Sequence, residues 1–473
     1  MNNRILLIFP NPGVKEQIYK KEEFLIVEEN GVTFFDKKSK KRKLCVKSNK
    51  IFYSLNQIRD QLNWWIPIFE RWIGKSYFFE EYRTKILEII NHIEDLKRIY
   101  KLETIVHFTA IPHHLISIAM NIYGSISSTK QIFFYSSIFD GRLIPISQDQ
   151  KNNKRKIILY KKTKINYTKL IDEFIENKLQ NNPPKLNHII TKKNQSLSYV
   201  ILLLSLKFLK NSILRIKPKN SNKKELFFFN ENKFSISNYF ELIRRQTKFL
   251  NAYERISIKN ESFIKEIEKS KKALLIAAHF QPEATSFPEG GLYMNHIDIV
   301  NRLRQIGYND TIFYKEHQGS NLYMDLPSIF ITKVSIYKNL SFLEYLKKLN
   351  VTFIKQSFPL ESKGKLSEMY LPITITGTLA IERSLVGLKT IICGDPIYNG
   401  LPGTIHIDEI KNKNFLNRIN LKKDFRIATN AKVFLKNFLD NNTLSNPFGI
   451  GNGIRTNKDK NELVDFLKYI NIK

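Results

Sequence analysis

A chain of 473 residues is too long for one ordinary hydrophobic core, so we expect two domains. An apolar content of 42% with 12% aromatic residues is typical of a globular protein and excludes a disordered chain. The formal net charge of +32 indicates anionic partners such as phosphorylated small molecules, anionic lipid or nucleic acid. No helix-turn-helix, zinc or RNA-recognition pattern accompanies this charge, so a specific nucleic-acid partner is not expected.

The cysteines and the apolar segments indicate the compartment. Cys45 and Cys393 are the only two cysteines and have no metal-ligand spacing, which favours a reducing compartment. The apolar run before Pro10 is too short for a signal peptide, and the run over residues 199–206 is too short to cross a bilayer. We expect a cytoplasmic protein. Basic residues around the apolar segment 199–216 leave peripheral attachment to the inner face of the cytoplasmic membrane open.

The first half of the chain predicts an α/β domain. A strand over residues 4–9 precedes a hairpin around Asn30-Gly31, with strands over 24–27 and 32–35. The elements expected after it are a helix over 82–100, a strand over 104–109, a helix over 112–122, a strand over 131–135 and a helix over 167–179. Two basic segments, 37–43 and 151–164, are expected to be loops or linkers.

Two histidines stand where the predicted strand 104–109 gives way to a helix. Pro112 precedes His113 and His114, which places both imidazoles near a helix N-terminus at a strand exit. Such a position suits a binding site, and a local capping or packing role suits it equally.

The second half alternates strand and helix in the way that produces a parallel sheet covered on both faces. The expected strands are 273–278, 311–315, 351–355, 371–376 and 389–393, and the expected helices between them are 294–306, 341–349 and 378–386. A last helix over 460–470 is expected to cross back to the first domain. We therefore predict an α/β protein with an N-terminal domain over 1–255, including a helical Lys/Asn-rich segment over about 150–255, and a C-terminal domain over 256–473.

Polar residues follow three of these buried strands. Ligands bind outside the carboxyl ends of strands in open α/β sheets, so the three strand ends predict one site. The candidate residues are His279, Gln281 and Glu283 after the first strand, Lys315 and His317 after the second, and Gly377, Thr378 and Glu382 after the fourth.

Each strand end suits a part of a phosphorylated ligand. Lys315 and His317 alternate with Glu316, so in extended backbone they point to one side and can meet a phosphate. Gly377-Thr378 opens a helix, whose N-terminal N–H groups favour an anion. Glu382 lies on the same helical face and can bind ribose hydroxyls. For each residue alone, a surface or packing role is the simpler interpretation; together they favour a site.

The motifs HFQPEATSFPEGG (279–291), YKEH (314–317) and ITGTLAIE (375–382) resemble, in order and spacing, the bacterial capsule polysaccharide biosynthesis family. That family includes the Kdo transferases of capsule export systems and has a GT-B-like architecture of two Rossmann-like domains facing a cleft. The resemblance is looser over IVHFTAIPHH (105–114) in the first half. The chain departs from the family at Gln318, where proline is usual, and at Arg383, where a small residue is usual.

The resemblance implies a metal-independent glycosyltransferase without a cofactor, whose donor is a nucleotide sugar, CMP-Kdo-like being one option. His279, Gln281 and Glu283 then face the donor sugar or the acceptor, while Lys315, His317, Gly377, Thr378 and Glu382 hold the nucleotide. His113 and His114 are placed on the side of a saccharide or glycolipid acceptor. Deprotonating the acceptor hydroxyl suits Glu283 or His279, and a nucleophilic role suits Glu283.

Other functions remain open at this point. A GT-B-like nucleotide-sugar epimerase would share the phosphate and ribose positions but would need no acceptor. A non-catalytic polysaccharide assembly or binding protein would not depend on Glu283. The net charge alone suggests a nucleic-acid binder, whose affinity would fall steeply with salt. The donor base, the sugar and the stereochemical outcome are not determined by the sequence.

Overall fold

The structure of the protein is a computed structural model. It describes residues 4–8, 25–28, 31–35, 41–44, 50–62, 79–107, 115–127, 129–136, 143–148, 155–160, 166–179, 244, 248–270, 272–279, 289–317, 338–360, 365–442, 462, 465–467 and 469–470.

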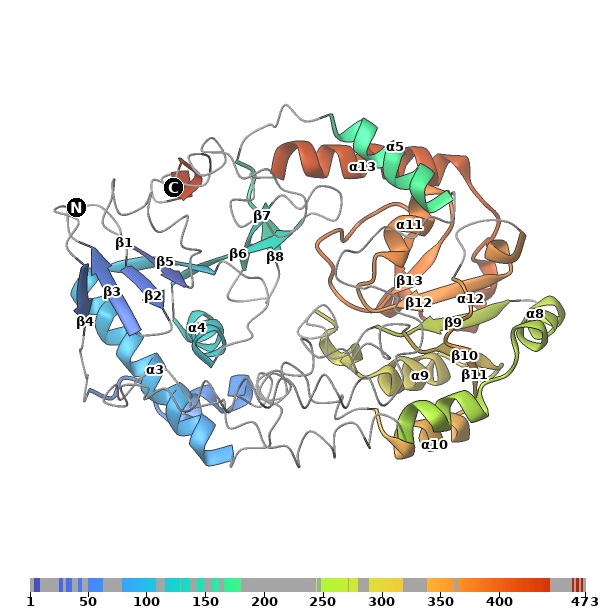
Figure 1. The fold of residues 1–473 in the computed structure, drawn as a ribbon, viewed down its shortest axis with the longest axis horizontal. Helices are drawn as coiled ribbons and strands as arrows, with labels where there is room; N and C mark the ends of the chain where they lie inside the picture. Colours follow the sequence, from blue (N-terminus) through green and yellow to red (C-terminus); the bar gives the residue numbers. More distant parts are fainter. Residues whose placement is uncertain are drawn as a thin grey trace, which may run out of the picture.

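The first half forms an eight-stranded sheet with the order β4-β3-β2-β1-β5-β6-β7-β8 (Figure 1). The four central strands β2, β1, β5 and β6 run parallel, and an antiparallel pair extends each edge. The strands are β1 (Arg4–Ile8), β2 (Leu25–Glu28), β3 (Gly31–Phe35), β4 (Lys41–Leu44), β5 (Leu102–His107), β6 (Lys130–Ser136), β7 (Leu143–Gln148) and β8 (Arg155–Ile157). Helix α3 (Phe79–Tyr100) precedes β5, and helix α4 (Leu115–Ile126) connects β5 to β6, which gives the succession of strand, helix and strand that the sequence predicts.

The outer strands of this sheet correct two expectations. The sequence predicts loops over residues 37–43 and 151–164, but β4 pairs with β3 and β8 pairs with β7. Both strands contain Lys and Arg, a composition that is typical of a solvated loop. Edge strands bear charged residues because these discourage pairing with further chains, so the basic composition is also compatible with a strand.

The second half forms a sheet of six parallel strands, as the alternating pattern predicts. The strands are β9 (Ala273–Ala277), β10 (Ile312–Lys315), β11 (Val351–Ile354), β12 (Tyr370–Thr374), β13 (Thr390–Ile392) and β14 (Thr404–His406). The helices are α8 (Asn260–Lys269), α9 (His296–Gln305), α10 (Leu340–Lys348), α11 (Leu379–Leu385), α12 (Lys413–Arg418) and α13 (Phe425–Asn442), with short 3₁₀ helices at Gly291–Met294, Lys365–Glu368 and Ile407–Glu409. The two separate Rossmann-like sheets confirm the predicted α/β fold class. Strand β14 is an addition to the predicted set.

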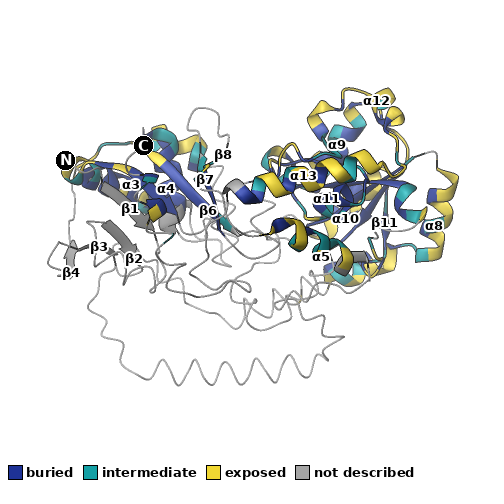
Figure 2. Cartoon of the chain, turned by 90° about the horizontal axis from the view of Figure 1, so that it is seen from above, coloured by how far each residue is buried: buried dark blue, intermediate teal, exposed yellow. Residues whose placement is uncertain are grey.

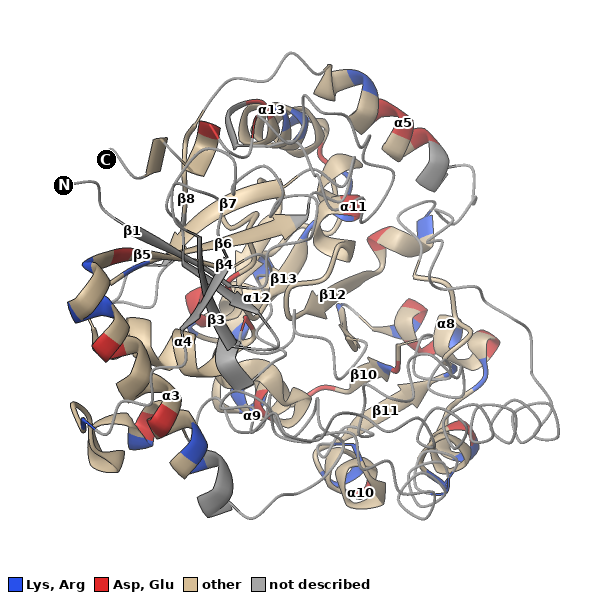
Figure 3. Ribbon diagram, turned by 60° about the vertical axis from the view of Figure 1, so that its left-hand side comes forward, with Lys and Arg blue, Asp and Glu red and all other residues tan. Residues whose placement is uncertain are grey.

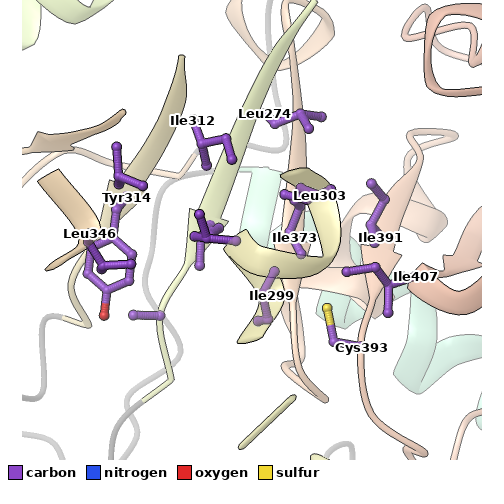
Figure 4. Packing of buried hydrophobic residues seen from close by; sticks show 14 of the residues in the cluster. Leu274, Ile299, Leu303, Ile312, Tyr314, Leu346, Ile373, Ile391, Cys393 and Ile407 are labelled. Carbon is purple, nitrogen blue, oxygen red and sulfur yellow. The ribbon is translucent and has the colours of Figure 1, made fainter. Parts of the chain in front are cut away.

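Helices bury apolar side chains on both faces of the second sheet. On one face, α9, α10 and α12 pack on alternate strand residues such as Leu274, Ile312 and Ile373 (Figure 4). On the other face, α8 packs on the strand residues between them, and α11, α13 and α5 (Tyr167–Leu179) form a second cluster around Ile392. The helices over this sheet turn their buried faces inward and their exposed faces to solvent (Figure 2). Burial on both faces explains why β9 is a continuous apolar run.

Two segments that the structure describes pack on the sheet of the other half of the sequence. Helix α5 follows the first sheet in sequence but packs against α11 and α13 of the second half (Figure 1). The C-terminal residues return to the first sheet, where the ring of Phe466 contacts Phe134 and Tyr160 at centroid distances of 5.8 and 5.1 Å. The described C-terminal residues therefore lie against the first sheet, as expected for the end of the chain. The boundary at residue 255 stays a prediction.

The helices of both halves carry side chains of both charges, with Lys and Arg interspersed with Asp and Glu (Figure 3). Within the ranges that the structure describes, no helix has both the length and the apolar character needed to cross a membrane.

Candidate functional site

The order of the second sheet predicts where its ligand binds. The strands lie in the order β11-β10-β9-β12-β13-β14, so the order reverses between β9 and β12. In doubly wound α/β sheets, ligands bind outside the carboxyl ends of the strands at this reversal. The residues that follow β9, β10 and β12 are those in which the sequence concentrates polar side chains.

His279 joins the exits of β9 and β12. Its side chain is buried, and its Nε2 accepts a hydrogen bond from the backbone N–H of Thr376 (3.2 Å). A backbone N–H only donates, so Nε2 is unprotonated and the proton of the neutral ring is on Nδ1. Burial lowers the pKa of His279 to about 3, with His317 and Lys338 lowering it further. In this arrangement neither ring nitrogen is available to accept a proton from a substrate.

Gly377 packs directly against His279. A Cβ at position 377 would lie 2.6 Å from Thr374 Oγ1 and 3.3 Å from His279 Nε2, so no other residue fits without displacement. Its carbonyl oxygen also accepts a hydrogen bond from Tyr398 Oη (2.7 Å). The glycine is therefore required by the close approach of the backbone to the two side chains.

Thr378 and Glu382 lie side by side where α11 begins. Thr378 Oγ1 donates to Glu382 Oε1 (3.3 Å), and the threonine is exposed while the glutamate is half-buried. A hydroxyl and a carboxylate at this position can pair with hydroxyls of a ligand. The arrangement is compatible with the expected ribose contact, which stays a prediction.

Lys315 is a buried cation. It is the last residue of β10 and is 5% exposed, and burial lowers its pKa to about 8 against the opposing effect of Glu316. Among the residues that the structure describes, Glu316 is the charge that acts on Lys315, and no hydrogen bond or ion pair of Lys315 Nζ is found. Buried charges are normally paired, because desolvation of an unpaired charge is costly. An anionic ligand would supply the missing partner.

Three cations at the opposite edge of the same sheet donate hydrogen bonds to main-chain carbonyl oxygens, unlike Lys315. Lys272 Nζ donates to main-chain carbonyls that include Asn417 O (3.0 Å), and Arg304 donates to Tyr308 O (2.6 Å) and Leu349 O. Arg383, which follows Glu382, is 1% exposed and donates to the carbonyl oxygen of Ser367 (3.0 Å). These three cations stabilise loop and helix ends and have structural roles.

His317 lies near Lys315 and is half-buried. Burial lowers its pKa to about 4, so the imidazole is neutral at pH 7 and offers a hydrogen-bond donor rather than a charge. Its backbone N–H donates to Glu316 Oε1 (3.0 Å), and its carbonyl oxygen accepts from the side-chain amide of Gln356. The backbone N–H and the carbonyl oxygen of His317 are thus both hydrogen-bonded.

The structure adds two residues that the sequence did not single out. Glu316 is fully buried between Lys315 and His317, and its Oε1 accepts from Lys338 Nζ (2.6 Å). The alternation that places Lys315 and His317 on one side of the strand sends Glu316 to the other, which the sequence could have indicated. Lys338 comes from a distant segment, and no local signal marks it.

A hydrogen bond connects the two halves of the molecule. Tyr135, near the end of β6 in the first sheet, donates from its hydroxyl to the Glu289 carboxylate. The carbonyl oxygen of Glu289 accepts from the backbone N–H of Asp395 (2.9 Å), which places Glu289 beside the exit of β13. The carboxyl ends of strands in both sheets therefore approach each other here.

Four predicted site residues lie outside the described residues: Gln281, Glu283, His113 and His114. The roles assigned to them stay predictions. Among the residues that are described, no group of three or more His, Cys, Asp and Glu side chains is arranged to hold a metal ion.

No protein-family model and no curated protein matches the chain. Among solved structures, it is similar to the KpsC beta Kdo 2,7 transferase of Thermosulfurimonas dismutans, at 13% identity over 83% of this chain and 98% of the other, with a TM-score of 0.28. It is also similar to the UDP-GlcNAc 2-epimerase of Methanocaldococcus jannaschii (14% identity, 99% of this chain, 100% of the other, TM-score 0.21). The UDP-GlcNAc 2-epimerase of Neisseria meningitidis bound to UDP-GlcNAc follows at 10% identity over 93% of this chain and 100% of the other, with a TM-score of 0.22. TM-scores this low establish no common fold, so membership of the capsule family stays a prediction from the motifs.

Proposed function

We propose that the chain is a glycosyltransferase of capsular or surface polysaccharide synthesis that moves a sugar from a nucleotide-sugar donor to a saccharide or glycolipid acceptor. The observation that carries the proposal is the buried Lys315, which has no partner among the described residues and lies beside the reversal point of the second sheet. A nucleotide phosphate is the ligand that this position of a Rossmann-like sheet accommodates best.

Departure of the nucleotide increases the negative charge on its phosphate as the glycosidic bond breaks. Groups fixed before the reaction stabilise that charge most effectively, and cationic side chains and N–H groups do so without a metal ion. We assign the stabilising positive charge to Lys315, which is largely protonated at pH 7 because its pKa is about 8. We assign a neutral hydrogen bond to His317 and close backbone contact to Gly377. Thr378 and Glu382 are assigned to the ribose.

The acceptor hydroxyl must lose its proton, or a carboxylate must attack the sugar if configuration is retained. We assign this step to Glu283 rather than His279, because the Nε2 of His279 is engaged by Thr376 N–H and its Nδ1 carries the proton. Gln281 completes the donor side. His113 and His114 are assigned to the acceptor. The proposal places the reaction in the cytoplasm, with the protein either free or attached peripherally to the inner face of the cytoplasmic membrane.

A thermal-shift panel of CMP, UDP, GDP and their sugars tests the first half of the proposal. A ligand that binds only the native state raises its stability, by about 2.7 kcal/mol at a hundred times the dissociation constant. We expect one nucleotide family to raise the melting temperature of the wild-type protein and to have little effect on Lys315→Met. The matched control is Lys272→Met, at the opposite edge of the sheet, which should keep the response.

Product analysis with the winning nucleotide sugar tests the second half. A glycosyltransferase releases the nucleotide only when an acceptor receives the sugar. Conversion of the sugar without an acceptor would identify an epimerase instead. Binding of saccharide with no turnover of any donor would favour a non-catalytic assembly protein.

A further inference from the structure

A buried network of side chains links the three strand exits of the candidate site. Lys338 Nζ donates to Glu316 Oε1 (2.6 Å) and to the carbonyl oxygen of His279 (3.4 Å). The side chains of Lys338 and Glu316 are 6% and 0% exposed. One amino group therefore connects the exit of β10 with the exit of β9.

The network extends from Lys338 to the backbone at both ends. Glu316 Oε1 also accepts the N–H of His317 (3.0 Å), and His279 Nε2 accepts the N–H of Thr376 (3.2 Å). The second oxygen of Glu316 accepts from Tyr314 Oη (3.1 Å), so both carboxylate oxygens are held. The β9–β10 pairing ends with the hydrogen bond from Ala278 N–H to Lys315 O (2.9 Å), and beyond it side chains join residues 315–317 with residues 376–378, which contain most of the proposed phosphate contacts.

We infer that Lys338 is a positioning residue that sets the distance between the Lys315–His317 segment and the turn at Gly377. The inference rests on the proposed function, because the geometry that Lys338 controls is that of the proposed phosphate site. Lys338 itself makes no contact with the ligand in this assignment, because its amino group is directed to Glu316 and His279.

Stabilisation of the fold is a weaker explanation for this pair. A buried ion pair contributes little net stability, because desolvation of the two charges offsets their attraction. The cations that stabilise loop and helix ends in this sheet, Lys272 and Arg304, bond to main-chain carbonyls at the opposite edge. Lys338 instead joins two strand exits at the edge where the sheet order predicts a ligand.

Backbone hydrogen exchange tests the inference without a ligand. The single variant Lys338→Met leaves Glu316 buried without its cation and is expected to be unstable, so the main test is the double variant Glu316→Gln with Lys338→Met. We expect it to fold, and to exchange the amides of Thr376 and His317 faster by about tenfold or more, because local opening becomes easier. Exchange within β11 and β13 should match the wild type. Lys338→Arg keeps a cation beside Glu316, so the amides of Thr376 and His317 should exchange as slowly as in the wild type. Lys272→Met should leave the exchange of both amides unchanged.

Calorimetric binding of CMP, UDP and GDP provides the second arm. A displacement of one segment by about 1 Å typically costs up to a hundredfold in rate, and we expect the double variant to bind the winning nucleotide about tenfold more weakly or worse. Unchanged exchange at Thr376 and His317, or faster exchange with wild-type affinity, would overturn the inference. If the wild-type protein binds none of the three nucleotides, the proposed function fails, and the exchange measurement still decides whether Lys338 joins the two segments.

Discussion

At the scale of single residues, Lys315 determines how binding should depend on pH. Its pKa in the unliganded protein is about 8, below the ordinary value of 10.5, because burial disfavours the charged form. A phosphate favours that charged form, so binding takes up a proton once the pH exceeds about 8. Nucleotide affinity should therefore be constant below this pH and fall above it, by at most about tenfold per pH unit.

Titration calorimetry of the nucleotide from about pH 6.5 to about pH 9.5 measures this dependence on both sides of the Lys315 pKa. Lys315→Arg should remove the fall, because a guanidinium stays protonated throughout this range. Lys315→Met should lower kcat/KM by about 10²–10³ and weaken binding at every pH. A wild-type affinity that does not change up to the highest pH would contradict the assignment of Lys315 to the phosphate.

Glu283 and His279 should differ in what their substitution changes. Glu283→Gln should reduce kcat by a large factor and leave nucleotide affinity nearly unchanged, because the role proposed for the carboxylate is at the sugar. His279→Gln should weaken nucleotide binding, because the imidazole holds the N–H of Thr376. Steady-state kinetics and calorimetry on both variants separate the two effects. Full turnover by Glu283→Gln with an identified donor and acceptor would reject the role of Glu283.

At the scale of an element, the turn between β12 and α11 is fixed by close packing. Gly377→Ala places a Cβ 2.6 Å from Thr374 Oγ1, so the turn or the imidazole of His279 must move. Overpacking of this kind typically costs about 1–3 kcal/mol of unfolding free energy. Because the moved backbone is the proposed phosphate contact, nucleotide affinity should fall together with stability. Denaturant unfolding and calorimetry measure the two quantities.

Gly307→Ala is the control for this variant. Gly307 follows α9 at the opposite edge of the sheet and has a φ of +84°, and a Cβ added there would meet no atom within 4 Å beyond its chain neighbours. Its substitution should cost about 1–2 kcal/mol through backbone strain alone. If both variants lose stability but bind nucleotide equally well, the turn at Gly377 does not contact the ligand.

At the scale of the whole molecule, the Tyr135–Glu289 hydrogen bond couples the two halves. A double-mutant cycle with Tyr135→Phe and Glu289→Gln should give a coupling energy of about 0.5–3 kcal/mol in unfolding free energy or in transition-state stabilisation, as is usual for residues in contact. A coupling energy in kcat/KM would mean that the hydrogen bond between the two halves contributes to transition-state stabilisation. Additive effects in both measurements would mean that the hydrogen bond does not join the halves in solution.

Acid should destabilise both halves through buried neutral histidines. His107, stacked on Phe133 in the first sheet, has a pKa of about 3 instead of 6.5 because it is buried, and His279 is comparable in the second. Below the ordinary pKa the unfolded chain binds protons that the folded chain does not. The unfolding free energy should thus decrease as the pH falls from 6.5, by up to about 1.4 kcal/mol per pH unit for each histidine.

Denaturant unfolding between about pH 7 and about pH 5 measures this slope. His107→Phe preserves an aromatic ring against Phe133 and removes one titrating group. The unfolding free energy of this variant should therefore change less with pH, by the contribution of one histidine. An equal slope in the wild type and the variant would show that His107 is protonated in the folded protein.

The local sequence determined most of the second sheet. The apolar runs that become β9, β10 and β12 are buried on both faces, and the helices between them keep a 3.6-residue period. These signals are local, so strands and helices could be predicted from them to within a few residues. The positions of Lys315, His317 and Gly377 at strand ends could be predicted from the same strands, and their roles in binding stay predictions.

Tertiary structure decided what local signals do not contain. Whether basic residues at 41–44 pair as an edge strand depends on β3, and the place of α5 depends on apolar surface offered by α11 and α13. The ion pair of Glu316 with Lys338 joins two strand exits that are distant along the chain, and the state of His279 depends on the N–H of Thr376, 97 residues away. Desolvation and hydrogen bonding act between residues that only the fold brings together. For this reason the sequence could propose His279 as a base, but only the hydrogen bond from Thr376 N–H shows which ring nitrogen carries the proton.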